Sequence, residues 1–122
     1  MDLGHLVGSF ITSVSTKVTK TGALAATIAV GEGGGYDVVL VLSDVVRLCI
    51  DGADLHSIVG GISVRRLPRT GAWPPEAHHL LGHHDNTAEL VWLRLDGPTT
   101  IEAVAQGLRV EEAGEVIWIG AG

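Results

Sequence analysis

Cysteine and aromatic residues are scarce in this sequence. Cys49 is the only cysteine, so no disulfide can form within the chain. The aromatic residues are one Phe, one Tyr and three Trp, and most of the apolar content is therefore aliphatic. The longest apolar run, Val38 to Leu42, is far shorter than the roughly 20 residues of a membrane-spanning helix. The N-terminus has no basic segment typical of a signal peptide, so we expect a cytoplasmic protein that contacts no membrane.

Positive charge is also sparse. The 122 residues include 8 basic and 14 acidic side chains, for a formal net charge of −6. Proteins that grip nucleic-acid phosphates present a basic face, whereas the densest basic stretch here is Arg65, Arg66 and Arg69. Nucleic-acid binding is therefore not expected. Apolar residues make up 46% of the chain, which is typical of a folded protein, and the length predicts a single domain over residues 1–122.

Motifs that carry known chemistry are absent. There is no Gly-x-Ser-x-Gly elbow and no dinucleotide fingerprint. The glycines between Gly31 and Gly35 lack the Gly-Lys-Ser/Thr ending of a phosphate-binding loop. Cys49 lies in an apolar run and is interpreted as a buried small residue rather than a reactive thiol. The sequence therefore predicts no catalytic residue, and we favour a protein that is not an enzyme.

Short segments rich in Val, Ile, Leu and Thr, separated by glycine, predict β-strands. Within these segments apolar residues either alternate with polar ones or fill both faces. The predicted strands are Ser9 to Thr19, Ala23 to Val30, Tyr36 to Ser43, Val45 to Ile50, Ile58 to Leu67, Thr87 to Leu95, Leu108 to Glu112 and Glu115 to Ile119.

One further segment and one long loop complete the expected fold. Thr99 to Gln106 fits a strand, although Thr99 and Glu102 also have the spacing of a helix capping box. Pro68 to Asn86 is rich in proline and histidine and predicts a long exposed loop. We predict an all-β domain, an antiparallel sandwich or barrel of about eight short strands with this His/Pro-rich loop. A β-rich α+β domain with one helix near residue 100 is the alternative.

Four of the six histidines crowd into this loop. They are His78, His79, His83 and His84, with Glu76 and Asp85 beside them. Imidazole and carboxylate groups together suit Zn²⁺, so these histidines are candidate metal ligands. A polar surface loop that is merely histidine-rich is the other interpretation, and it predicts no cofactor. Several imidazoles that titrate near pH 6.5 would add positive charge to the loop on acidification.

Two regions have the character of contact surfaces. Trp73 stands beside a proline pair in the long loop and, with Arg65, Arg66 and Arg69, forms the predicted partner-binding set. The small, weakly charged side chains of the 25–29 segment, which are Ala25, Thr27 and Ala29, suit contact with a second copy. Open sheet edges also invite pairing. The partner is therefore predicted to be a protein, and a homo-oligomer is expected.

A resemblance to known proteins covers about 23 residues. Leu42 to Gly52 has the pattern of a strand, Asp-Val and then Leu-x-Ile-x-Gly, and a second strand with Gly61 and Val64 follows. This pattern resembles that of small bacterial proteins, namely uncharacterised domains and immunity proteins of polymorphic toxin systems. The resemblance implies a non-enzymatic protein that binds a partner, and it implies no particular functional residue.

The sequence therefore predicts a non-catalytic binding or assembly domain, either an immunity-type protein that binds another protein or a self-associating structural subunit. Two alternatives stay open. One is a small metal-dependent enzyme that uses the cluster from His78 to Asp85. The other is a β-barrel that binds a small ligand in an apolar cavity.

Overall fold

The computed structural model describes residues 3–31, 38–52, 58–67, 89–112 and 115–119. These residues form a short 3-10 helix, η1 (Gly4–Leu6), and one antiparallel sheet of seven strands. The strands are β1 (Phe10–Val18), β2 (Leu24–Gly31), β3 (Val38–Asp51), β4 (Gly61–Leu67), β5 (Leu90–Asp96), β6 (Thr100–Glu112) and β7 (Glu115–Ile119). No helix in this part of the chain is long and apolar enough to cross a membrane.

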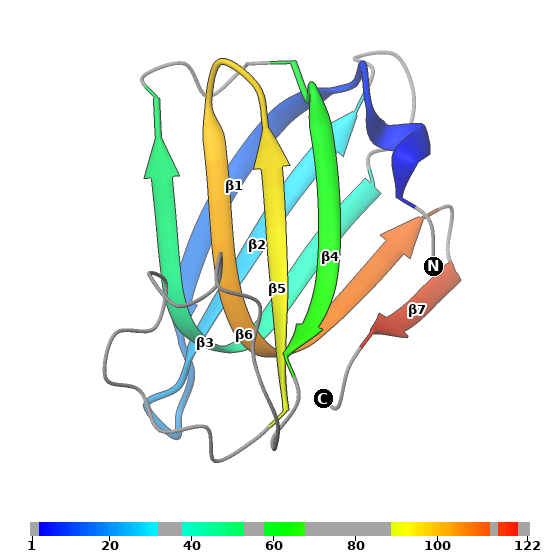
Figure 1. Ribbon diagram of the computed structural model, residues 1–122. Coiled ribbons are helices and arrows are strands. Elements are labelled where there is room, and N and C mark those ends of the chain that lie inside the picture. The colour runs from blue at the N-terminus through cyan, green and yellow to red at the C-terminus, as the bar shows by residue number, and fades with distance from the viewer. Residues whose placement is uncertain (1–2, 32–37, 53–57, 68–88, 113–114, 120–122) are drawn as a thin grey trace.

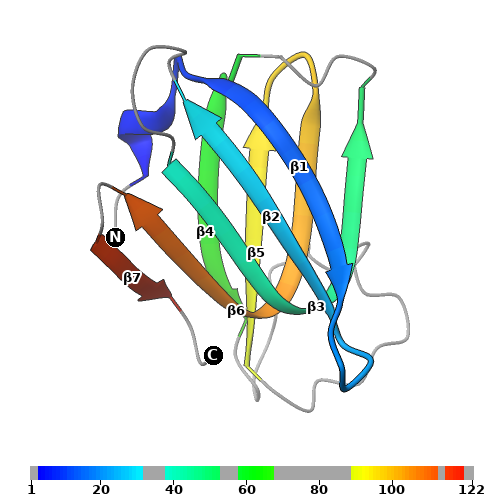
Figure 2. The same ribbon diagram turned by 180° about the vertical axis from the view of Figure 1, so that it is seen from behind.

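The sheet folds over on itself and makes two layers (Figures 1 and 2). The strand order is β1-β2-β3-β6-β5-β4, and β7 pairs with β6. The first halves of β3 and β6 belong to different layers, because both strands curve from one layer into the other. One layer contains β1, β2, β7, the start of β3 and the end of β6. The other contains β4, β5, the end of β3 and the start of β6. The sheet is not closed, so the predicted all-β sandwich is confirmed.

Two long strands replace four predicted short ones. The segments predicted on either side of Asp44 are both part of β3, and β6 joins Thr99 to Gln106 with Leu108 to Glu112. Asp44 adopts φ 51°, a left-handed conformation that Asp tolerates, and a β-bulge follows between Val45 and Arg47. These two features bend β3 without ending it. The helix considered near residue 100 is a strand.

The core lies between the two layers and is aliphatic. On β5, Val91, Leu93 and Leu95 point into it while Trp92 points away. On β1 the predicted alternation fails at its start, because a bulge between Ile11 and Ser13 shifts the register. Ile11 is therefore buried, whereas Phe10 is 46% exposed.

The N-terminal segment ties the two layers together at one end. Leu3, which directly precedes η1, and Leu6, its last residue, are buried in the core. The Gly8 N–H donates to the Val59 carbonyl, and the Val59 N–H donates to the Ser9 carbonyl, both at 2.8 Å. A β-bridge between Phe10 and Ile58 continues this contact. The start of β1 is thus held beside the segment that leads into β4.

A glycine at the end of β3 is required by close contact and by its backbone. Gly52 has φ +136°, and a Cβ placed on it would lie 2.7 Å from Thr99 Oγ1 and 2.8 Å from Thr99 Cα. Gly22, in the β1–β2 turn, also has a positive φ of +86°, but a Cβ there would meet nothing within 4 Å. A side chain at position 22 would therefore meet backbone strain alone, whereas a side chain at position 52 would meet both backbone strain and a steric conflict.

We expect Gly52→Ala to lower the free energy of unfolding by about 3 kcal/mol, because strain and the displacement of Thr99 add together. Gly22→Ala, which adds backbone strain alone, should cost about 1 kcal/mol. Urea denaturation of both variants measures the difference. Equal losses would show that the contact with Thr99 is not what requires glycine at position 52.

Candidate functional site

The outward face of the β4–β5–β6 layer carries a network of charged side chains around a tryptophan. Trp92 is 5% exposed and packs with Leu67, Leu90 and Val104 in a small apolar cluster outside the main core. Its neighbours across the sheet are Arg65 on β4 and Val104 on β6. The next row of the same face contains Ser63, Arg94 and Glu102. Trp92 therefore lies at the boundary between an apolar cluster and a charged surface.

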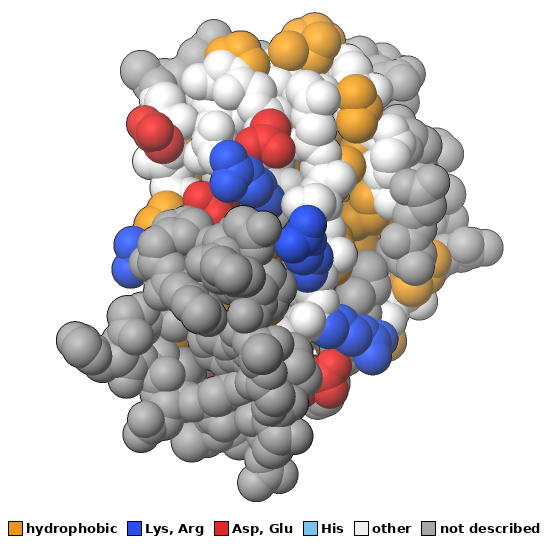
Figure 3. Space-filling view, viewed as in Figure 1, with side chains coloured by type: hydrophobic (Ala, Val, Ile, Leu, Met, Phe, Trp, Pro, Cys, Tyr) orange, Lys and Arg blue, Asp and Glu red, His pale blue; other side chains and the backbone are white. Residues whose placement is uncertain are grey.

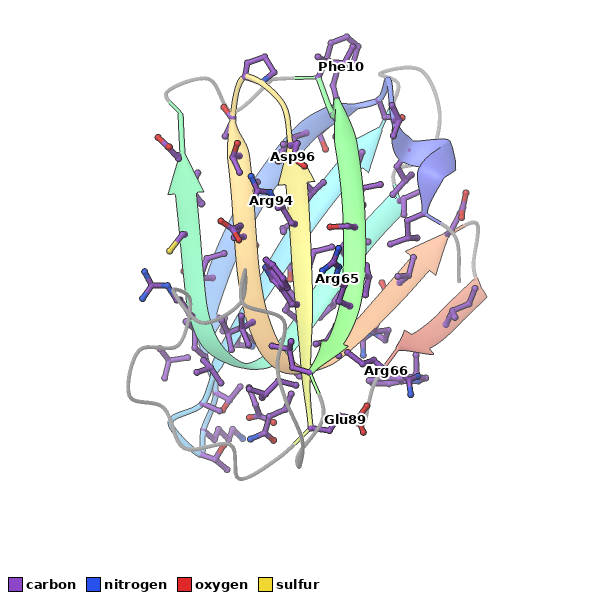
Figure 4. All side chains as sticks on the ribbon, viewed as in Figure 1. Phe10, Arg65, Arg66, Glu89, Arg94 and Asp96 are labelled. Atoms are coloured by element: carbon purple, nitrogen blue, oxygen red, sulfur yellow. The ribbon has the colours of Figure 1, made fainter. Side chains whose placement is uncertain are left out.

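Arg94 connects two carboxylates in this network. Its Nε lies 2.7 Å from Asp96 Oδ1, and its guanidinium Nη1 lies 3.7 Å from Glu102 Oε1. The hydrogen bond to Asp96 raises the pKa of Arg94, more than burial lowers it, so the side chain stays charged. The Trp92 Nε1–H donates to Glu102 Oε2 at 3.2 Å. Glu102 thus contacts both a buried indole and a cation. Figure 4 shows Arg94 and Asp96 side by side on β5.

The two predicted partner-binding arginines that the structure describes lie on β4. Arg65 places its guanidinium 5.7 Å from the centre of the Trp92 ring, which is a cation–π distance. Arg66 Nη1 lies 3.8 Å from Glu89 Oε1. Arg66 is on the face of β4 opposite to that of Arg65. Both side chains are exposed, and their surroundings carry charge of both signs (Figure 3). They do not form a joint basic patch.

Other predicted site residues lie outside the described residues. These are Arg69, Trp73 and the candidate metal ligands His78, His79, His83 and His84. Within the described ranges, no three His, Cys, Asp or Glu side chains come together as a metal site would require. The zinc hypothesis therefore stays a prediction from sequence. Cys49, interpreted above as buried, is a half-buried free thiol on the outward face, in register with Glu102.

The small-residue face predicted for self-association lies on the opposite side of the molecule. Ala25, Thr27 and Ala29 are half-buried on the outward face of β2. An open groove of about 530 Å³ runs along this face between β1 and β3, and Lys17 and Val41 are among its lining residues. The groove is open to solvent and is lined by both polar and apolar side chains, so nothing in it selects a ligand class.

The strand β7 forms an open edge that the sequence analysis did not single out. β7 pairs with β6 on one side, and no other described strand pairs with it (Figures 1 and 2). Three consecutive apolar residues of this strand are exposed: Val116 by 51%, Ile117 by 39% and Trp118 by 57%. We call this strand the β7 edge. The sequence feature that could have identified it is the unbroken apolar run of a short strand. A strand with one solvent-exposed face would instead alternate apolar and polar residues.

Charged residues of β6 stand next to the β7 edge. Arg109 is in register with Trp118 and places its guanidinium 5.4 Å from the centre of the indole ring. Glu111 is in register with Val116, and Glu111 Oε1 lies 2.9 Å from Arg109 Nε. The exposed apolar strand is thus bordered by one cation and one anion on the same face.

Comparison of the chain with protein-family models, with curated proteins and with the solved structures finds no match. Its function therefore has to be inferred from the chemistry of its own surfaces. Of those described, the outward face around Trp92 is internally neutralised by its ion pairs, whereas the β7 edge leaves apolar side chains and backbone groups without a described neighbour.

Glu102→Ala should lower the free energy of unfolding by about 1–3 kcal/mol, because it removes the acceptor of the Trp92 indole N–H. Glu102→Gln keeps an acceptor oxygen and loses only the partly exposed attraction to Arg94, so its cost should stay below about 1 kcal/mol. Urea denaturation followed by tryptophan fluorescence tests both. If the two variants lost the same stability, the carboxylate charge and not the hydrogen bond would be the dominant contribution.

Proposed function

We propose that this protein is a non-catalytic binding or assembly domain that contacts a protein partner through the β7 edge. The supporting observation is the exposure of Val116, Ile117 and Trp118 along an open strand. Backbone N–H and C=O groups of every second residue in an edge strand point away from its neighbour and are free to pair. An apolar strand with free backbone groups is the arrangement that strand-addition complexes use.

The other described edges are β1, β4 and the part of β3 after Asp44, which pairs only with β6, and all three carry features that oppose pairing. The part of β3 after Asp44 has a bulge between Val45 and Arg47, and Arg47 is exposed. β1 has a bulge between Ile11 and Ser13, and Lys17 is exposed near its end. β4 carries the exposed side chains of Arg65 and Arg66. Bulges and charges of this kind protect natural sheet edges from unwanted association. The described side chains of β7 are all apolar, which favours this edge as the contact surface.

The large exposed side chain of Trp118 also supports a protein partner. Trp118 is the most exposed aromatic side chain among the described residues. Tryptophan and arginine are both enriched among the residues that dominate the binding energy of protein interfaces. Arg109 holds the ring in place by its cation–π contact, so part of the side-chain ordering that binding requires is already present.

A single cysteine at the edge tests the proposal. In a Cys49→Ala background, Val116→Cys should react with a maleimide several-fold more slowly in native cell extract, or in concentrated purified protein, than in the dilute purified protein. Val18→Cys is the matched control, because Val18 is 66% exposed near the end of β1. Slowing at position 116 under either condition supports the proposal. If positions 116 and 18 stay equally reactive under all conditions, the β7 edge is not a contact surface.

A different measurement distinguishes the proposed binding domain from the alternative, a metal-dependent enzyme. Elemental analysis of the untagged protein should detect less than one transition metal per chain if the domain is a binding module. About one zinc per chain, lost in His79→Ala and His83→Ala, would replace this proposal with the metal hypothesis.

A further inference from the structure

We infer that the partner of the β7 edge is a second copy of this chain, with the two β7 strands paired antiparallel about a two-fold axis at Ile117. The inference rests on the proposed role of the β7 edge and adds the identity of the partner and the register. It follows from the order of side chains along β6 and β7, which is self-complementary only in this arrangement.

The register follows from the geometry of the strand. An axis at Ile117 overlaps all of β7 with its counterpart, because Glu115 then faces Ile119 of the partner subunit. Moving the axis by one residue keeps the side chains on their proper faces but leaves part of each strand unpaired. A five-residue strand has few backbone pairs to form, so full overlap is the most favourable register.

Side-chain size fits the same register. With the axis at Ile117, Trp118 lies directly opposite the partner subunit's Val116, and Val116 lies opposite the partner subunit's Trp118. The two exposed side chains of each row are thus one large and one small. Aromatic and β-branched residues make favourable cross-strand pairs. An axis at Trp118 would instead place two indole rings against each other.

The charges that border the edge fit as well. Arg109 is the neighbour of Trp118, and Glu111 is the neighbour of Val116. In the proposed dimer each row across the interface therefore begins with Arg109 and ends with the partner subunit's Glu111. Trp118 and the partner subunit's Val116 lie between them, so the two ends of a row carry opposite charges three strand spacings, about 14 Å, apart. With the axis at Trp118, or with parallel strands, Arg109 would share a row with the partner subunit's Arg109. Because salt screens charges at this separation, the charge pattern adds a small preference for this register over those that place two arginines in one row.

The resulting dimer extends one layer of the sandwich across both copies. The paired β7 strands would join the β1–β2–β3–β6–β7 layers of the two copies into one continuous antiparallel sheet. The outward face around Trp92 belongs to the other layer and stays accessible in both copies. The dimer would thus leave the charged network and the β4 arginines free.

Disulfide trapping tests the register. In a Cys49→Ala background, Ile117→Cys would face its own counterpart, and directly opposed Cβ atoms in antiparallel strands lie about 4.5–5.5 Å apart, within a small adjustment of disulfide geometry. Mild oxidation should therefore link Ile117→Cys into dimers several-fold faster than the matched control Val18→Cys. Equal rates for the two variants would overturn the inference.

A mixed experiment separates the proposed register from other contacts between copies. Val116→Cys mixed with Trp118→Cys should give the mixed disulfide in preference to either homodimer, because these two positions face each other. Dominant Trp118→Cys homodimers would place the axis at Trp118 and overturn the register. Variants are compared only where their circular dichroism and thermal unfolding match those of the parent chain.

Light scattering over a concentration series gives an independent measure. As the concentration rises, the measured mass of the parent chain should increase from that of one chain to that of two. The Trp118→Lys variant should keep the mass of one chain at every concentration while its fold is retained. A parent chain that stays at one mass throughout overturns the second-copy inference. If Val116→Cys is then still protected in native extract, the β7 edge binds a different protein and the proposed function survives. If Val116→Cys is unprotected there too, both proposals fail.

Discussion

The pairing of β3 with β6 is the interaction on which the rest of this structure depends. The two strands stay paired from Val39 opposite Glu111 to Asp51 opposite Thr100, through the bend at Asp44 and a one-residue shift of register between Val45 and Arg47. Because both strands run through the fold, each layer is built outward from the same central pair. β2 and β7 attach to it on one side of the bend, and β5 attaches on the other.

This arrangement also determines where the sheet ends. A sheet that folds over at its central strands has free strands at its margins, and among the described residues these are β1, β4, β7 and the part of β3 after the bend. The contact of Phe10 with Ile58 brings the β1 and β4 margins together at one end, and η1 packs beside β4. No comparable contact involves β7 within the described ranges. The contact surface proposed here therefore follows from the topology as much as from the residues of the strand.

Much of the fold could be predicted from sequence, because alternation and glycine spacing are local signals. The strands at Ser9 to Thr19 and Ala23 to Val30 and the all-β class were predicted correctly. The bend at Asp44 was not, because an Asp-Val pair after a strand has the same local signature as a turn. The bulge after Ile11 was also missed, since a single extra residue shifts the register without changing composition.

The candidate site was less predictable, because its residues are distant in sequence. Arg65 was identified as a contact residue, yet its position over Trp92 depends on the pairing of β4 with β5. Trp118 was expected in a strand, but its exposure arises from the absence of a described strand beyond β7. The alignment of Arg109 and Glu111 beside it depends on the register of β6 with β7. The predicted metal cluster and Trp73 lie outside the described residues.

The β3–β6 pairing has a consequence for how the chain folds. Ile50 pairs with Ile101, which is 51 positions away, and Val39 pairs with Glu111, which is farther still. Contacts this remote must be reached before either layer is complete, and the loop-closure entropy opposes them until they form. β-sandwiches with such a high contact order fold in roughly milliseconds to seconds. The strands β6 and β7, by contrast, are adjacent in the sequence. β7 can therefore pair with β6 before β3 and β6 have paired.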